Sequence, residues 1–473
     1  MTIATTNPAT GTVVERFDPT PEAEIDRRIG LAVRGFEVLR RAGFDQRAGW
    51  MNAAADLLDS ERDQVAAMMT LEMGKTVASA RAEVAKCANA CRFYAKHAQR
   101  FLADDRDAEP AAVNARQAYG VYRPLGTVLA IMPWNFPLWQ AMRFAAPALM
   151  AGNTGLLKHA SNVPRTALYL GELFGRAGFP PGAFQTLLIG SGLVERVLCD
   201  PRVRAVTLTG SEAAGRSVAA IAGRELKKTV LELGGSDPFV VMPSADIARA
   251  AQVATTARCQ NNGQSCIAAK RFIVHTDVFD QFAAAFVEAM AALVVGDPMD
   301  ESTGVGPLVN EQGRRDIQAQ VADAVSHGAT LLCGGSAPDG PGWYYPPTVI
   351  TGITPAMRMY GEEVFGPVAG LYRVDGYEQA VQLANATAFG LGSNAWTNDP
   401  HEQQRFVEDL DAGAVFINGM VTSYPELPFG GVKNSGYGRE LSAHGIREFC
   451  NLKTVWIGGD TPATPSHAGS HAE

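Results

Sequence analysis

The chain has 473 residues, more than one hydrophobic core usually supports, which predicts two or three domains. Hydrophobic residues make up 47% and charged residues 19%, the balance of an ordinary soluble globular protein. A net charge of −8 without any Lys/Arg run argues against a nucleic-acid surface. Charges or prolines interrupt every apolar stretch, so we expect no membrane span. The N-terminus lacks a signal-peptide pattern. Seven scattered cysteines favour free thiols in a cytoplasmic protein.

The first part of the chain is predicted to be helical. Apolar residues recur at helical spacing between about residues 21 and 102, which predicts three amphipathic helices. Gly74 and Lys75 are expected to end one of them. The stretch 118–124 then alternates like an exposed strand.

Strands and helices alternate from residue 126 onward. Apolar strands are predicted at 128–131, 154–158, 184–189, 205–209 and 229–232, separated mostly by helical stretches, which indicates a doubly wound nucleotide-binding sheet. A second alternating block extends from 271–274 to 414–417 and predicts a second α/β domain. The tail, residues 459–473, is rich in Pro, Ser, Gly and His and is predicted to be disordered; we expect no metal site.

Three short stretches carry groups suited to covalent chemistry. Residues 261–266 read Asn-Asn-Gly-Gln-Ser-Cys and present Cys266 after a turn, Glu232 ends an apolar strand, and Asn135 lies between two prolines. Thiol, carboxylate and amide are the nucleophile, the base for water and the oxyanion donor that aldehyde oxidation requires. Taken singly, each has a plainer interpretation: a buried small hydrophobe, a surface carboxylate and a turn residue. Cys259 competes as nucleophile by proximity, but its surroundings predict a helix.

These stretches resemble the signatures of the NAD(P)-dependent aldehyde dehydrogenase superfamily. Two further stretches strengthen the resemblance: 362–367 reads Glu-Glu-Val-Phe-Gly-Pro, and 428–436 reads Pro-Phe-Gly-Gly-Val-Lys-Asn-Ser-Gly. All five occur in family order, and the resemblance covers nearly the whole chain. Within the superfamily the chain is most similar to bacterial, NADP-preferring succinate-semialdehyde dehydrogenases.

The resemblance implies an α/β fold with two doubly wound Rossmann-like domains and a β-arm for oligomerisation. The dinucleotide-binding domain would comprise residues 1–112 and 126–233, and the catalytic domain residues 234–440. The arm would comprise residues 113–125 and 446–458. Because the arm strands are far apart in sequence and need a partner for their edges, we expect a homodimer or homotetramer.

The resemblance also implies the catalytic roles. Cys266 would attack the aldehyde, and the Asn135 side chain and the Cys266 backbone N–H would stabilise the oxyanion. Collapse would pass a hydride to the cofactor and leave a thioester, which water activated by Glu232 would hydrolyse.

Cofactor-binding residues follow from the same resemblance. Gly210 and Ser211 follow a strand and open a helix, where free N–H groups suit a pyrophosphate, although Gly-Ser at a helix start is also an ordinary N-cap. Glu363 would hold the nicotinamide ribose and Phe365 would flank the ring. Trp134 and Leu233 are expected beside the same cofactor.

The stretch Lys158, His159, Ala160 and Ser161 bears on cofactor choice. NAD-preferring relatives usually carry Glu at the position of Ser161, where a carboxylate binds the ribose 2′-hydroxyl and repels a 2′-phosphate. Ser161 removes that repulsion and Lys158 adds positive charge, so NADP is the predicted cofactor and NAD the alternative. The plainer interpretation is a polar strand end. His159 stands where relatives usually have proline.

The substrate residues rest on thinner matches. Arg143 and Ser423 match residues that succinate-semialdehyde dehydrogenases use for the distal carboxylate, which a guanidinium suits by forked hydrogen bonds. Some members have a second arginine where this chain has Gln260. The leading hypothesis is oxidation of succinate semialdehyde. The alternatives are another small aldehyde such as glutarate semialdehyde, a CoA-acylating relative, which Glu232 argues against, or a nucleotide-binding protein with a vestigial site.

Overall fold

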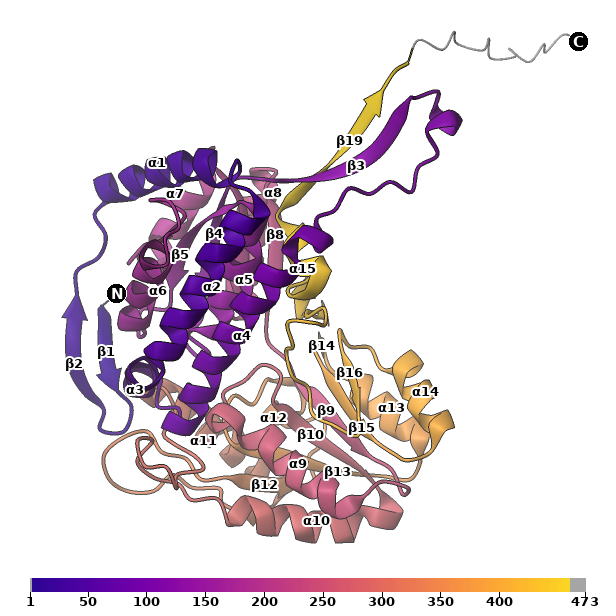
Figure 1. The fold of residues 1–473 in the computed structure, drawn as a ribbon. Helices are drawn as coiled ribbons and strands as arrows, with labels where there is room; N and C mark the ends of the chain where they lie inside the picture. Colours follow the sequence, from indigo (N-terminus) through magenta and orange to yellow (C-terminus); the bar gives the residue numbers. More distant parts are fainter. Residues whose placement is uncertain (1, 460–473) are drawn as a thin grey trace, which may run out of the picture.

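A computed structural model describes residues 2–459 of the chain (Figure 1). Two mainly parallel sheets form the body of the molecule, each covered by helices on both faces, and a two-stranded ribbon projects from the body as an arm. The predicted α/β fold with two doubly wound sheets and a β-arm is therefore confirmed.

The first sheet has the strand order β18-β8-β7-β4-β5-β6, with β18 antiparallel and the others parallel. Its strands are β4 (Thr127–Met132), β5 (Thr154–His159), β6 (Phe184–Thr186), β7 (Val203–Thr209), β8 (Lys228–Glu232) and β18 (Gly436–Tyr437). The chain adds β5 and β6 on one side of β4 and then β7 and β8 on the other. The strand order therefore reverses between β4 and β7, which is where doubly wound sheets bind ligands.

Alternating residues of β4 show why helices cover both faces of this sheet. Val128 and Ala130 pack in one apolar layer with α2, α4, α5 and α6, whereas Leu129 packs in another with α1, α7 and α8. The helices are α1 (Glu22–Leu39), α2 (Phe44–Ser60), α3 (Arg62–Met73), α4 (Val77–Phe101), α5 (Trp139–Ala151), α6 (Pro164–Arg176), α7 (Val194–Cys199) and α8 (Glu212–Arg224).

The N-terminal region has four helices, α1 to α4, so the prediction of three is wrong. Glu61 leaves the helical conformation at φ −104° and ψ 12°, which separates α2 from α3. Helical spacing of apolar residues continues on both sides of this single residue, so periodicity could not reveal the break. The predicted stop is confirmed, because Gly74 adopts φ 80° directly after α3. A hairpin of β1 (Ile3–Asn7) and β2 (Thr12–Phe17), which was not predicted, precedes α1.

The second sheet has the order β11-β12-β13-β10-β9-β15-β16. Its strands are β9 (Asp237–Val241), β10 (Ala269–His275), β11 (Thr330–Cys333), β12 (Thr348–Thr351), β13 (Val368–Val374), β15 (Ser393–Trp396) and β16 (Val415–Ile417). Helices α9 (Ile247–Cys259) and α10 (Thr276–Ala291) cover one face. The other face packs against α11 (Glu311–Ser326), α12 (Arg358–Gly361), α13 (Tyr377–Asn385) and α14 (Pro400–Asp409). The second part also contains the short strands β14 (Phe389–Gly390) and β17 (Val432–Lys433) and a 3₁₀ turn at Gln260–Gly263; two further 3₁₀ turns, Pro110–Val113 and Ser191–Leu193, precede β3 and α7.

The arm is an antiparallel pair of β3 (Gln117–Pro124) and β19 (Cys450–Ile457), as predicted from the two distant stretches. Helix α15 (Ser442–Glu448) leads into β19 and packs against α4 and α5. The ribbon projects away from both sheets (Figure 1), and Leu452 and Trp456 on it remain 52% and 56% exposed.

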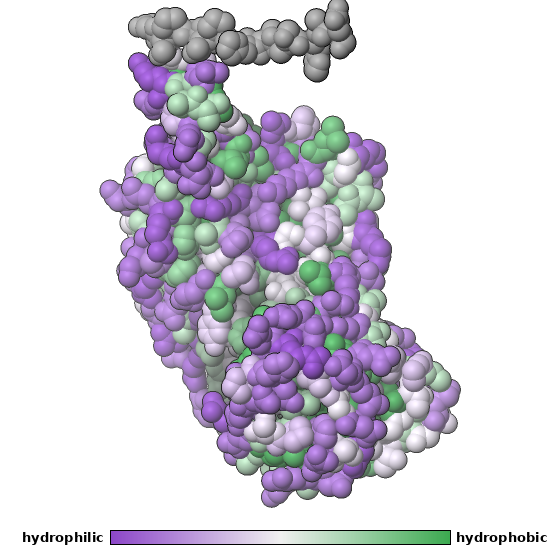
Figure 2. Space-filling model, turned by 90° about the vertical axis from the view of Figure 1, so that its right-hand side faces the viewer, coloured by the Kyte–Doolittle hydropathy of each residue, from purple (hydrophilic) through white to green (hydrophobic). Residues whose placement is uncertain are grey.

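The surface beyond the arm is ordinary. Figure 2 shows a mainly hydrophilic face on which hydrophobic residues are interspersed. Within residues 2–459, no helix is both long and apolar enough to cross a membrane.

The predicted disordered tail falls almost entirely outside the described residues. The residue ranges assigned to the two domains stay a prediction; β18, from the range assigned to the catalytic domain, joins the first sheet beside β8.

Candidate active site

A cavity of about 240 Å³ opens beyond the carboxyl ends of β4 and β7, at the reversal of strand order. It gathers residues from five separate stretches of the chain. The predicted site residues that line it are Trp134, Asn135, Gly210, Ser211, Leu233, Cys266, Glu363 and Phe365. Within residues 2–459, its wall does not include Glu232, Lys158, His159, Ala160, Ser161, Arg143 or Ser423.

The backbone before Cys266 explains why the sequence reads Asn-Asn-Gly. Asn261, Asn262 and Gly263 adopt φ values of 55°, 58° and 73° in succession. Asn tolerates the left-handed region better than other side-chain-bearing residues, and Gly adopts it freely. A Cβ on Gly263 would also lie 2.4 Å from the Gly366 carbonyl carbon. The turn therefore demands these residue types, and it presents Cys266 at the end of the loop.

Buried amides then fix the strained turn in place. The Asn262 side chain donates to the carbonyls of Gly74 (2.8 Å) and Pro307 (3.0 Å) and accepts from the Gly306 N–H (2.9 Å). The buried Arg258 guanidinium donates to the Gly263 carbonyl (2.6 Å). Strain of this kind persists only where surrounding contacts over-determine it, and such sites are often functional.

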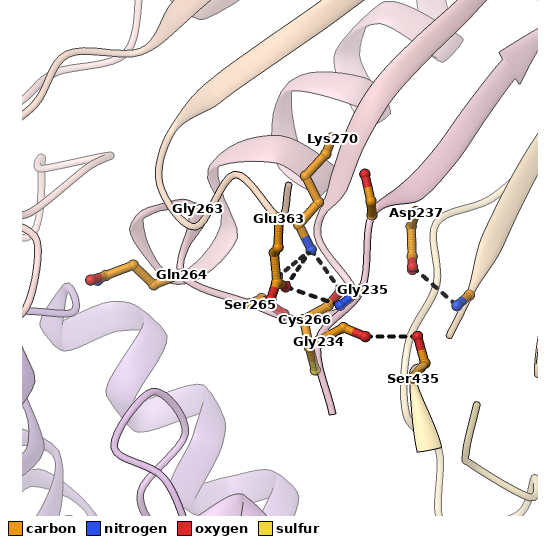
Figure 3. A network of polar contacts seen from close by, with 12 residues as sticks. Gly234, Gly235, Asp237, Gly263, Gln264, Ser265, Cys266, Lys270, Glu363 and Ser435 are labelled. Atoms are coloured by element: carbon orange, nitrogen blue, oxygen red, sulfur yellow. Dashed lines mark hydrogen bonds and ion pairs between the residues drawn. The ribbon is translucent and has the colours of Figure 1, made fainter. Parts of the chain in front are cut away.

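Lys270 joins the loop that carries Cys266 to Glu363 (Figure 3). Its Nζ donates to the carbonyls of Ser265 (2.8 Å) and Cys266 (2.6 Å) and lies 3.3 Å from Oε1 of Glu363. The same Glu363 oxygen accepts the Gly235 N–H at 3.1 Å. A buried ammonium thus holds the Cys266 backbone and the Glu363 carboxylate in one network, which fixes their relative positions.

Cys266 is partly exposed towards the cavity. Burial raises the pKa of its thiol to about 12, while the positive charges of Arg143 and Lys270 oppose that rise. For Cys266 to act as the predicted nucleophile, its thiol must lose its proton. Cys259, the competing candidate, is buried at the end of α9 with its sulfur 3.5 Å from Met290, and is a packing residue.

Asn135 lies directly beside the loop that carries Cys266. Its Nδ2 donates to the Gln264 carbonyl (3.0 Å), and its own carbonyl accepts from Asn261 (2.7 Å). A primary amide has two N–H donors, so one of them remains for an oxyanion. The structure places thiol and amide together, as the proposed oxyanion role requires.

Glu232 ends β8 and is buried, but it does not line the cavity. In the described chain neither of its carboxylate oxygens has a hydrogen-bond partner, and a Cβ on Gly430 would lie 2.8 Å from Oε1. Burial, and then the neighbouring carboxylate of Glu440, raise its pKa well above the usual range. Both effects favour the protonated form of the Glu232 carboxyl.

Arg143 binds a carboxylate of the protein. Its Nε lies 2.6 Å from Oε2 of Glu440, both side chains are buried, and its guanidinium lies over the Phe429 ring. Arg143 opposes the raised pKa of both Glu232 and Glu440. The arginine expected to bind substrate therefore favours the ionised forms of the two buried carboxyls, Glu232 and Glu440.

The start of α8 suits a phosphate. Ser211 is the N-cap, and its Oγ accepts the Ala214 N–H at 3.3 Å, which leaves the hydroxyl proton as a donor. Ser211 is exposed and Gly210 lies beside the same cavity. The first-turn N–H groups of the helix point outward from this end, as pyrophosphate binding requires.

The stretch after β5 is ordered by His159. Its ring is buried, with Nε2 2.8 Å from the Pro137 carbonyl and Nδ1 accepting the Ala160 N–H at 2.9 Å. Burial lowers its pKa to about 4, so it is neutral and links β5 to the loop carrying Asn135. Lys158 and Ser161 are half-buried beside it, and burial lowers the pKa of Lys158.

Aromatic side chains enclose the cofactor side of the cavity. Trp134 and Phe365 meet edge-to-face with ring centroids 5.7 Å apart. Glu363 lies at the same wall, and burial raises its pKa while Lys270 opposes the rise. Aromatic walls, a carboxylate and a helix N-terminus together fit a nicotinamide dinucleotide. Among residues 2–459, no group of three or more His, Cys, Asp or Glu could hold a metal ion.

Comparison with known proteins agrees with this geometry. A model of the aldehyde dehydrogenase family matches residues 1–455.

The chain belongs to the aldehyde dehydrogenase family. It is 65% identical over 457 residues to succinate-semialdehyde dehydrogenase [NADP(+)] 1 of Mycobacterium tuberculosis, covering 97% of this chain and 100% of that one. It is also 65% identical over 459 residues to succinate-semialdehyde dehydrogenase [NADP(+)] of Mycobacterium avium, covering 97% of both chains.

Two solved structures of succinate-semialdehyde dehydrogenases share the fold of this aldehyde dehydrogenase. Succinic semialdehyde dehydrogenase from Streptococcus pyogenes, in complex with NADP+, superposes with a TM-score of 0.93 at 38% identity, covering 97% of this chain and 100% of that chain. Succinate-semialdehyde dehydrogenase from Burkholderia pseudomallei superposes with a TM-score of 0.93 at 36% identity, covering 97% and 95%.

Some residues of the site were missed from the sequence. Lys270 follows Cys266 by four residues, and Glu440 follows the glycine-rich stretch 428–436 by four residues, so both lay near motifs already noted. Their roles depend on contacts between distant segments, namely Lys270 with Glu363 and Glu440 with Arg143. Pairing of this kind is set by the fold and has no local pattern.

Proposed function

We propose that this aldehyde dehydrogenase oxidises succinate semialdehyde to succinate in the cytoplasm, with reduction of NADP+. The observation that carries the chemistry is the cavity shared by Cys266, Asn135 and six of the predicted cofactor-binding residues, namely Trp134, Gly210, Ser211, Leu233, Glu363 and Phe365. The substrate and cofactor are supported by the names of relatives 65% identical over almost the whole chain.

The proposed steps use the residues in turn. The Cys266 thiolate attacks the aldehyde carbon, and the remaining Asn135 N–H and the Cys266 backbone N–H stabilise the oxyanion. A bound NADP+ would supply the hydride acceptor that turns this adduct into the thioester. Water attacks the thioester on Cys266 while its proton passes to the Glu232 carboxylate, releasing the acid and the thiolate. Glu232 must reach the cavity and be ionised for the last step.

The distal carboxylate of the substrate is proposed to bind near Arg143 and Ser423. Gln260 stands where some relatives carry a second arginine, and its Nε2 is buried without a hydrogen-bond partner in the described chain. A second candidate is therefore another small aldehyde such as glutarate semialdehyde. A panel of aldehydes, each measured with NADP+ and NAD+, tests both: the highest kcat/KM with succinate semialdehyde and NADP+ supports the proposal, and equal values for uncharged aldehydes contradict it.

Ser161→Glu is expected to shift preference from NADP towards NAD. The new carboxylate would face the 2′-phosphate beside Lys158, and like-charge juxtaposition costs several kcal/mol, which is about tenfold or more in NADP efficiency. NAD efficiency should hold or rise, because a carboxylate can accept hydrogen bonds from the ribose. The measurement is kcat/KM for both cofactors at saturating aldehyde.

Ser161→Gln is the matched control, since Gln has the size of Glu without its charge. It should change the NADP-to-NAD ratio much less than Ser161→Glu does. A change of less than about twofold in the Glu variant, well under 1 kcal/mol, would place Ser161 away from the phosphate.

We propose that the arm mediates assembly into a dimer or tetramer. The β3–β19 ribbon leaves unpaired edges and exposed apolar side chains on a projecting segment. Leu452→Glu should lower the sedimentation mass towards that of the monomer, whereas Val407→Glu, at a 59% exposed position on α14, should not. A monomeric wild-type enzyme that is fully active would contradict this assignment.

A further inference from the structure

Lys86, on α4, carries a positive charge beside the predicted substrate residue Ser423. Its Nζ lies 2.8 Å from the Ser423 Oγ and 4.3 Å from the centroid of the Trp139 ring. The Trp139 indole N–H donates to the same Oγ at 2.9 Å. Because the oxygen accepts from both neighbours, the hydroxyl proton of Ser423 remains to be donated elsewhere.

The neighbouring cationic side chains are paired with carboxylates, whereas Lys86 has no carboxylate partner among the described residues. Lys75 is paired with Glu83, whose other oxygen accepts the N–H groups of Leu138 and Trp139. Arg143 is paired with Glu440. Across residues 2–459, no carboxylate lies within ion-pair distance of Lys86, although its side chain is only partly exposed.

Lys86 does not line the cavity itself, but it contacts Trp139 next to the cavity wall. Trp139, which its ammonium overlies, precedes Gln140, and Gln140 lines the cavity with Cys266. Phe136, Trp139 and Cys266 belong to one apolar cluster. For Lys86 to meet the substrate, the chain of an aldehyde held at Cys266 must extend past Trp139 towards Lys86 and Ser423.

We propose that Lys86, with the Ser423 hydroxyl, is the main binding group for the distal carboxylate of the substrate. The inference rests on the proposed function and deepens it, because it moves that role from Arg143, whose charge is balanced by Glu440, to a cation without a counter-ion. A partly buried ammonium is costly to desolvate, and the Trp139 ring offsets only part of that cost. A substrate carboxylate would offset the remaining desolvation cost through charge-assisted hydrogen bonds with Lys86, whereas an uncharged aldehyde would not.

The test compares succinate semialdehyde with butanal, which has the same chain length and no carboxylate. Lys86→Met keeps an unbranched apolar stem against Trp139 and removes the charge. Its kcat/KM for succinate semialdehyde should fall about 10- to 100-fold, the loss expected for a hydrogen-bonded charge, mainly through KM. The value for butanal should stay within about threefold. Lys86→Arg should recover part of the loss. Lys96→Met, at an exposed position of the same helix, should leave kcat/KM unchanged for both substrates.

The outcomes separate this inference from the proposed function. A wild-type enzyme that shows no preference for succinate semialdehyde contradicts the proposed function itself. A wild-type preference that persists within about twofold in Lys86→Met overturns the role of Lys86. Selective loss of that preference in Arg143→Met, with Lys86→Met unaffected, would return the carboxylate site to Arg143.

The wild-type enzyme provides a second test that needs no variant. Burial, and then the charge of Arg143, lower the pKa of Lys86 to about 8. The other groups facing it are Glu83, Cys87 and Lys75; burial raises the pKa of Cys87 far above this range. As pH rises through about 8, Lys86 loses its charge, so the ratio of kcat/KM for succinate semialdehyde to that for butanal should fall. The ratio cancels the titration of Cys266, and a flat ratio from pH 6 to 10 contradicts the inference.

Discussion

Cys266→Ala is expected to abolish aldehyde oxidation, with kcat falling by roughly 10⁵-fold or more, as removal of a covalent nucleophile does. The substitution removes the atom that forms both the hemithioacetal and the thioester. Neither a burst of NADPH nor an acyl-enzyme should form. The variant should still bind NADP+, because the cofactor residues Gly210, Ser211 and Phe365 are untouched. Stopped-flow absorbance and cofactor titration together measure both properties.

Cys259→Ala is the control for this loss. Cys259 is buried against Met290 and takes no part in the cavity, so its substitution should lower stability slightly and leave the burst intact. Activity retained in Cys266→Ala but lost in Cys259→Ala would reverse the assignment of the nucleophile.

Glu232→Gln is expected to preserve the first turnover and slow the steady state by about 10²- to 10⁴-fold, the usual contribution of a general base. Gln has nearly the size of Glu but cannot accept the proton of the attacking water. The burst of NADPH should therefore approach one equivalent per active site, followed by a much slower phase. Equal loss of burst and steady state would contradict a role confined to deacylation.

The pH dependence provides an independent check on Glu232. Burial and the Glu440 carboxylate raise its pKa well above the usual range, so the ionised base becomes populated only as pH rises. Where deacylation limits turnover, the wild-type rate should climb with increasing pH through that raised pKa. In Glu232→Gln this climb should be absent from the slow phase. A wild-type rate that falls over the same range would show that Glu232 is not the limiting base.

Much of this arrangement was predictable from local patterns. The buried strand at 128–131 was evident from its continuous apolar run, and a second strand was predicted at 205–209; their parallel pairing brings the following Asn135 and Ser211 to one cavity wall. The alternation of residues 118–124 predicted a strand, whereas its pairing with the late strand of the arm was implied by the family resemblance. The turn before Cys266 was marked by glycine, and the two asparagines that share its left-handed conformation follow the same physical rule.

Other features depend on distant contacts and left no local pattern. The break at Glu61 is a change in one residue's backbone within continuous helical spacing. The predicted role of Arg143 took no account of Glu440. This residue lies almost three hundred positions further along the chain and forms a buried ion pair with Arg143. Lys86 was not singled out, because a lysine on an amphipathic helix is ordinarily solvated; only its contacts with Trp139 and Ser423 distinguish it.

The most direct test of the account is to trap the covalent intermediate. Glu232→Gln enzyme is mixed with succinate semialdehyde and NADP+, quenched with acid after the burst, digested and analysed by mass spectrometry. The account predicts one equivalent of NADPH per site and a succinyl group on the peptide containing Cys266, absent when NADP+ is omitted. NADPH formed without acylation of Cys266, or a succinyl group on another cysteine, would contradict covalent oxidation at Cys266.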